Sequence, residues 1–186
     1  ATNVVHPAVA GITSLSYDHV ELLGHTLSLI AFEKAGIIKP GVPVVSAPQE
    51  PEAMAVIQRV CHDTGARLVV VGSDWQWEKG NADLSGQTFS VQGPAGLRLD
   101  DLRIGLLGRH QRDNATTAIA MLYELRGQGL NITDDALRTG LATAQWPGRR
   151  AAAPRPASTH WSVVRRAEVM PATAAEGVAP PADRGP

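Results

Sequence analysis

Strand-like and helix-like patterns alternate over the first 74 residues, and this alternation limits the fold more than any other feature of the sequence. Three short runs rich in β-branched and small residues have the character of buried strands: 8–15, 39–47 and 66–74. Between them, apolar residues recur at helical spacing over 25–35 and 51–65. Strands and helices in this order predict an α/β fold with a mostly parallel sheet and flanking helices.

The boundaries of both helices carry residues that favour helix ends. Gly36 and Gly65 each follow the last residue of a helical pattern, where glycine is common. Pro51 suits the first turn of the second helix, where a backbone N–H would have no helical partner. The apolar residues expected to face the core are Leu27, Ile30, Ala31, Ala53, Ile57, Val60 and Cys61.

The pattern changes after Asp74. Alternating residues and Gly-rich turns over 75–108 predict two or more antiparallel strands appended to the sheet. A long helix is predicted over 109–129, and a shorter one over 131–144 with Thr133 as its N-cap. One face of the long helix is expected to carry Ala115, Ala118, Ile119, Leu122 and Leu125.

The composition changes abruptly near the end of the sequence. Residues 151–186 are dominated by Ala and Pro and contain no Leu, Ile, Phe or Lys. Such a segment cannot bury enough apolar surface to offset the entropy lost on ordering it. We therefore expect a domain over 1–149 and a disordered tail over 150–186, whose composition would follow from a reading-frame shift.

Charge and cysteine content exclude several classes of protein. The net charge is −1, from 17 basic and 18 acidic residues, and no block of like charge indicates binding to nucleic acid or to an anionic membrane. No apolar run approaches the roughly 20 residues that a membrane-spanning helix needs. The single Cys61 cannot form an internal disulfide, which suits a cytoplasmic protein.

Two pairs of polar residues are candidates for a metal or phosphate site. Asp18 and His19 follow the first predicted strand, and ligands gather at the carboxyl ends of parallel strands. The pair equally suits a cap and a polar loop. Glu33 and Lys34 stand near the end of the next helix, where a solvated ion pair explains them. A role in the site begun by His19 would require Lys34 to be turned inward.

Two further residues are candidates for contacts with a nucleotide. Asn114 lies in the first turns of the long helix, and its amide can pair with both the donor and the acceptor of a purine edge. The same residue could simply cap the helix. Arg149 follows a Trp-Pro-Gly turn, which would hold a phosphate-binding guanidinium rigidly or merely leave an arginine exposed.

The order and spacing of these segments resemble those of a known family. The chain is similar to folylpolyglutamate synthase and to the bifunctional dihydrofolate synthase, members of the Mur ligase superfamily. The resemblance covers roughly residues 1–149 and rests on "ATNVV", "ITSLSYDHVELLGHTLSLIAFEKAGIIKPGVPVV", "LLGRHQRDNATTAIA" and "WPGR". It implies a partial central domain of the Mur ligase type.

The resemblance also implies a reaction, its co-substrates and the roles of individual residues. ATP and Mg²⁺ would convert the carboxylate of dihydropteroate or folate into an acyl phosphate, which the amine of L-glutamate attacks, in an enzyme expected to be a monomer. His19 matches the family's magnesium ligand, and Lys34 matches a lysine that becomes carbamylated and helps to hold a metal. Asn114 and Arg149 match residues that contact ATP. Ala1 falls at the edge of the pteroate site.

Three motifs of the family are missing from the sequence, and two alternatives stay open. There is no Gly-rich phosphate loop, no metal-binding Glu before "ATN" and no "DGAHN"-like stretch after "WPGR". We therefore expect the second half of a central ATPase domain, and an isolated chain without ligase activity. The alternatives are a non-catalytic remnant and another Mur ligase, such as a peptidoglycan precursor ligase.

Overall fold

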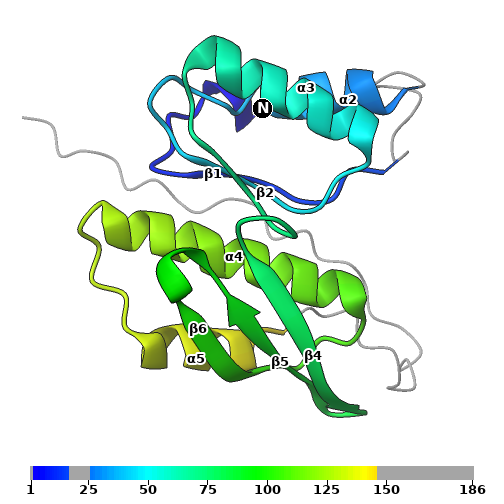
Figure 1. Ribbon diagram of the computed structural model, residues 1–186, viewed down its shortest axis with the longest axis vertical. Coiled ribbons are helices and arrows are strands. Elements are labelled where there is room, and N and C mark those ends of the chain that lie inside the picture. Colours follow the sequence, from blue (N-terminus) through cyan, green and yellow to red (C-terminus); the bar gives the residue numbers. More distant parts are fainter. Residues whose placement is uncertain (1, 17–25, 146–186) are drawn as a thin grey trace, which may run out of the picture. The chain divides into compact units, whose positions relative to one another are not determined.

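The computed structural model describes residues 2–16 and 26–145, which include two sheets and the helices that cover them (Figure 1). The tail predicted over 150–186 lies outside the described residues. A short 3-10 helix, η1 (Thr2–Val4), begins the described part.

The predicted parallel sheet is present. Its strands β1 (Ala10–Ile12), β2 (Val44–Ser46) and β3 (Leu68–Val70) are hydrogen-bonded in the order β1-β2-β3, and both pairs are parallel. Each strand is shorter than its apolar run.

Helices α2 (Leu27–Ala35) and α3 (Pro51–Thr64) confirm the two helical patterns that were predicted between these strands. Thr26 caps α2, because its hydroxyl oxygen accepts from the Leu29 N–H at 3.3 Å. Gly65 ends α3 in the left-handed conformation, with φ of 66°. The apolar sides of the helices form one core cluster with β1 and β2. A second cluster lies between the two helices themselves.

The antiparallel strands form a second sheet of their own instead of extending the parallel one. Strands β4 (Gln76–Asp83), β5 (Gly86–Gln92) and β6 (Arg98–Ile104) pair in that order, and the short 3-10 helix η2 (Pro94–Gly96) joins the last two. Within the described residues, no strand of one sheet is hydrogen-bonded to a strand of the other. A single isolated β-bridge pairs Val71 with Trp75, in the segment between β3 and β4. Except at Asp100 and Asp101, which are both exposed, burial alternates along β6, as expected for a sheet with one buried face.

Helix α4 (Arg109–Gly127) contacts both sheets, and α5 (Asp134–Thr143) packs along β6 (Figure 1). The largest core cluster therefore joins the faces of the two sheets to the apolar residues of α4. Ala115 and Ile119 are buried as predicted, but Ala118 is exposed. The prediction was wrong there because α4 packs on two sheets, which displaces its buried face away from Ala118.

Within residues 2–16 and 26–145, no helix combines the length and the apolar character that crossing a membrane demands.

Candidate functional site

One side chain ties together the loops that leave β1 and β2 at the carboxyl end of the parallel sheet. Gln49 Nε2 donates to the Thr13 carbonyl at 2.9 Å, and the Leu15 N–H donates to Gln49 Oε1 at 2.9 Å. In a parallel sheet, one residue of a neighbouring strand likewise accepts from one N–H and donates to one carbonyl two residues apart. The Gln49 amide therefore continues the backbone hydrogen-bonding pattern of β1 beyond Ile12. Gln49 Nε2 also donates to the buried Ser46 Oγ at 3.3 Å.

A second polar contact joins the starts of α2 and α3. Glu52 Oε1 accepts from the Ser28 hydroxyl at 2.7 Å and from the Ser28 N–H at 3.2 Å. Residues 17–25, which contain the predicted metal ligand His19, lie outside the described residues. The described chain on either side of them is thus held by Gln49 and Glu52. The sequence alone did not reveal either residue, because a lone Gln or Glu near a helix start carries no specific signal.

Two more of the predicted site residues cannot be placed. Ala1, the predicted edge of the pteroate site, and Arg149, the predicted ATP contact, lie outside the described residues. The segment that follows Ala1 is described, however. Its Asn3 side chain lies so close to Gly36 that a Cβ on that glycine would be 2.4 Å from Asn3 Nδ2. Asn3 therefore lies against the end of helix α2.

Lys34 lies in the last turn of α2, and its side chain is exposed. This position suits the favourable interaction of a cation with a helix C-terminus. The Lys34 side chain is therefore not turned inward in the structure. Within the described residues, no group of three or more His, Cys, Asp or Glu side chains could hold a metal ion. A joint site of Lys34 and His19 therefore stays a prediction.

Asn114 is half-buried near the start of α4. The N-cap position of this helix is taken by Gly108, so Asn114 is not the capping residue. Asn114 Nδ2 donates to Gln111 Oε1 at 3.5 Å, at the outer limit of a hydrogen bond. The exposed Ala118 follows one turn later on the same side of the helix. The Asn114 amide is thus placed on the open side of α4, where a ligand could reach it.

The opposite side of the start of α4 is held by polar side chains of the antiparallel sheet. Gln87 from β5 is 2% exposed and accepts a hydrogen bond from Arg112 Nη1. Trp77 from β4 donates to Asp113 Oδ1 at 2.8 Å, and its ring lies 4.4 Å from Arg112 Cζ. The roles of Gln87 and Trp77 were not predicted, because the pattern of an alternating strand does not reveal which helix its side chains contact.

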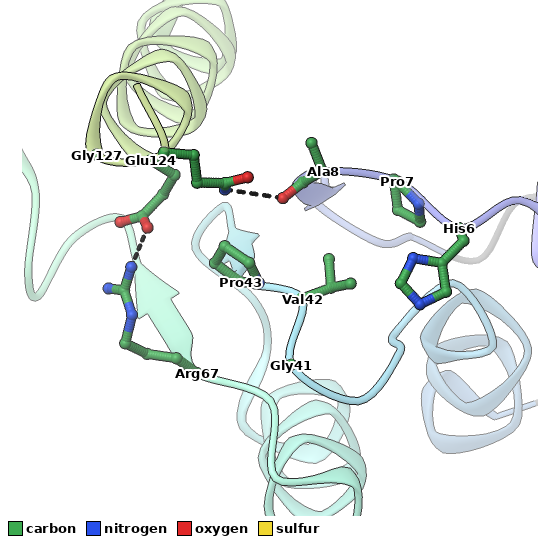
Figure 2. A pocket seen from close by; sticks show the side chains of 10 residues that line it. His6, Pro7, Ala8, Gly41, Val42, Pro43, Arg67, Glu124 and Gly127 are labelled. Atoms are coloured by element: carbon green, nitrogen blue, oxygen red, sulfur yellow. Dashed lines mark hydrogen bonds and ion pairs between the residues drawn. The ribbon is translucent and has the colours of Figure 1, made fainter. Parts of the chain in front are cut away.

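A cavity of about 570 Å³ lies at the other end of the parallel sheet (Figure 2). It is lined by the residues that precede the three strands and by the end of α4. These include His6, Pro43 and Arg67, and the Arg67 guanidinium forms an ion pair with Glu124. Parallel α/β sheets bind their ligands at the carboxyl ends of the strands. This cavity therefore lies away from the Gln49 edge and is not the candidate site.

The single cysteine is a structural residue. Cys61 is 3% exposed on the buried face of α3, and burial raises the pKa of its thiol from 9.0 to about 11. A thiol with so high a pKa is almost wholly protonated at neutral pH and is a poor nucleophile. Cys61 therefore has no part in the candidate site.

Comparison with known proteins relates this geometry to one family. The Mur ligase middle domain matches residues 1–122. The chain is 39% identical over 150 residues to the dihydrofolate synthase/folylpolyglutamate synthase of Bacillus subtilis (strain 168), covering 80% of this chain and 35% of that protein. It is 37% identical over 151 residues to the folylpolyglutamate synthase of Lacticaseibacillus casei, with coverage of 80% and 35%. The chain thus spans about a third of the length of the curated relatives it matches.

Solved structures show the same similarity in three dimensions. An FPGS-AMPPCP-folate complex matches with a TM-score of 0.75 and 36% identity, over 79% of this chain and 36% of that one. The E. coli FolC structure in complex with DHPP and ADP matches with a TM-score of 0.65 and 34% identity, over 80% and 33%.

Proposed function

The chain belongs to the Mur ligase family, and from this premise we propose that residues 1–149 form the second half of the ATP-binding central domain of a folate ligase. The proposed activity of the whole protein is the ATP-dependent addition of L-glutamate to dihydropteroate or folate, in a cytoplasmic monomer. The names of the relatives and the ligands of the matching structures support this substrate class.

The position of Asn114 carries the proposal. Its half-buried amide lies on the open side of α4 and is held by one long hydrogen bond from Nδ2 to Gln111. Asn114 Oδ1 can accept from the amino group of adenine while Nδ2 donates to a ring nitrogen. Guanine offers two acceptors at the same edge, so this amide favours ATP over GTP. Arg149 would provide a guanidinium for the phosphates.

The proposed metal ligands fit Mg²⁺ by their chemistry. A carbamate formed from the Lys34 amine and carbon dioxide would offer the hard oxygen ligands that Mg²⁺ prefers. Its use in the site requires the side chain, which is exposed in this structure, to turn toward His19. His19 would supply a second ligand. When bound, Mg²⁺ neutralises charge on the phosphates. Removing the Lys34 charge also removes a cation that would repel the ion.

The proposed reaction has two displacement steps. An oxygen of the pteroate or folate carboxylate attacks the γ-phosphorus of ATP, and ADP leaves. The glutamate amine then attacks the carbonyl carbon of the acyl phosphate, loses a proton and forms the amide, while inorganic phosphate leaves. The chain's part in this reaction is to hold the nucleotide in line with the carboxylate, which is the main protein contribution to phosphoryl transfer.

Calorimetry tests the nucleotide site. We expect saturable binding of Mg-AMPPCP to the chain, and a roughly five- to thirtyfold loss of affinity in Asn114→Ala, since a lost hydrogen-bonding partner costs about 1–2 kcal/mol. Asn131→Ala is the matched control, because Asn131 is exposed in the loop before α5. Equal affinities of the two variants, or no saturable binding by the unaltered chain, would contradict the proposal.

A chimaera tests the reaction. Residues 1–145 would replace the matching segment of the Bacillus subtilis relative, and glutamate ligation to dihydropteroate or folate would be measured. We expect activity that is lost in the His19→Ala and Lys34→Ala chimaeras. A folded chimaera, with native circular dichroism, that ligates no glutamate would argue against the folate ligase.

A further inference from the structure

Two side chains of the antiparallel sheet, Gln87 and Trp77, hold the start of α4 from the side opposite Asn114. We propose that both are positioning residues for Asn114 and that they set the preference of the site for adenine over guanine. This inference rests on the proposed function, because it takes Asn114 as the residue that contacts the nucleotide base. It adds a selectivity role for two residues that lie outside the nucleotide contact itself.

Helix α4 begins without a side-chain cap of its own. Its N-cap residue is Gly108, which has φ of 110° and offers no side-chain oxygen to the first turn. A Cβ at this position would lie 2.8 Å from His110 Cε1, and the backbone conformation is one that favours glycine. Because the local sequence cannot supply a cap, the orientation of the first turn depends on groups from elsewhere in the fold.

Gln87 supplies part of this orientation. Its Nε2 donates to the Leu106 carbonyl at 2.7 Å and to the Gly108 carbonyl at 2.9 Å, and its Oε1 accepts from Arg112. One buried amide thus connects the loop before α4 to the first turn of the helix. A carboxylate at the same position would still accept from Arg112 but would repel the two carbonyl oxygens.

Trp77 fixes the rotation of the helix about its axis. The indole Nε1–H donates to Asp113 at 2.8 Å, while the ring lies against the Arg112 guanidinium at 4.4 Å. Arg112 is 8% exposed, so its positive charge is stabilised by these protein groups in place of water. Because Arg112 and Asp113 are both held on the sheet side, Asn114 is directed to the open side.

A short chain of contacts links this network to the Asn114 amide. The Gln111 N–H donates to the Gly108 carbonyl at 3.2 Å, the same carbonyl that Gln87 holds. Gln111 Oε1 then accepts from Asn114 Nδ2. Paired hydrogen bonds to a base edge depend on the direction of the amide more strongly than the attraction of a phosphate does. A small rotation of α4 should therefore lower base selectivity before it abolishes nucleotide binding.

The test measures the ratio of affinities for Mg-AMPPCP and Mg-GMPPCP by calorimetry on the 186-residue chain and its variants. Trp77→Phe removes the indole N–H but keeps an aromatic ring against Arg112, and Gln87→Glu keeps the acceptor for Arg112 but removes both donated hydrogen bonds. We expect each to lower the adenine preference about tenfold. Gln92→Glu, on the same strand but away from α4, should leave the preference unchanged.

The outcomes separate this inference from the proposed function. If Asn114→Ala lowers the adenine preference while Trp77→Phe and Gln87→Glu keep that of the unaltered chain, the positioning role is overturned and the base contact stands. If Asn114→Ala leaves the preference unchanged, the base contact fails and the inference fails with it. Addition of Trp77→Phe to Asn114→Ala should cause no further loss. Circular dichroism confirms folding, and Trp77→Phe carries the test if Gln87→Glu does not fold.

Discussion

The parallel sheet and the antiparallel sheet of this protein keep their polar groups in different places. The middle strand of the parallel sheet is covered on both faces, and Val44, Val45 and Ser46 are 0% exposed. The polar contacts of that sheet therefore lie at strand ends, where Gln49 joins two loops. The antiparallel sheet has one open face, so charged side chains such as Arg98 lie along its strands.

This difference explains why the two regions contribute differently to the candidate site. In a sheet that is buried on both faces, functional groups reach solvent only where the strands end. In a sheet with one buried face, a polar side chain such as Gln87 can point inward and hold a helix. Helix α4 contacts both sheets, and the following changes test how strongly it couples them.

The largest expected effect is at the helix between the two sheets. Ile119 is 0% exposed in the cluster that joins the faces of both sheets, so Ile119→Ala should lower the free energy of unfolding by about 3 kcal/mol. Ala118→Gly, at the exposed neighbour, should cost about 1 kcal/mol through helix propensity alone. Urea titration followed by circular dichroism measures both. Two separate transitions in Ile119→Ala would show that the sheets unfold independently.

The next effect concerns the parallel region alone and depends on pH. Burial holds the pKa of Cys61 near 11, above its ordinary value of 9.0, so the unfolded state loses the thiol proton first as pH rises. Stability from this group is complete below pH 9 and should decline by about 2 kcal/mol as the pH passes 11. Denaturant titrations at pH 8 and pH 11 measure the decline, which should be smaller in Cys61→Ala. An equal decline in that variant would contradict the assignment.

The polar contact at the carboxyl edge should have an intermediate effect. Gln49→Ala leaves the Leu15 N–H and the Thr13 carbonyl without this partner, so it should cost about 1–2 kcal/mol. Hydrogen exchange of the Leu15 amide should become markedly faster. Gln58→Ala, on the exposed side of α3, is the matched control and should change neither quantity appreciably. Unchanged exchange at Leu15 in Gln49→Ala would show that the loop is held by other groups.

The smallest effect is expected on the open face of the antiparallel sheet. Glu78 accepts from the Arg98 guanidinium at 3.2 Å, and both side chains are largely exposed. Glu78→Gln should therefore change the free energy of unfolding by less than about 0.5 kcal/mol. Thermal unfolding at low and high salt measures it. A loss comparable to that of Gln49→Ala would erase the contrast between the two sheets.

The sequence predicted the positions of helices and strands more reliably than it predicted which strands pair in the same sheet. The alternation of apolar runs and helical patterns located β1 to β3, α2 and α3, because burial on one or both faces imposes a period that a single segment can show. The antiparallel strands predicted over 75–108 are also confirmed, but the sequence did not predict that they form a sheet separate from the parallel one. Hydrogen bonding between sheets depends on the path of the chain after Trp75, which leaves no periodic signal.

Among the predicted site residues, the sequence by itself determined chemical identities: an imidazole at His19, an amine at Lys34 and an amide at Asn114. Only the tertiary structure decided that Asn114 lies on the open side of α4 and that Lys34 is exposed at the end of α2. It alone brought Gln87 to the start of α4. The physical reason is that side-chain chemistry is local to a residue, whereas orientation depends on contacts between segments far apart in the chain.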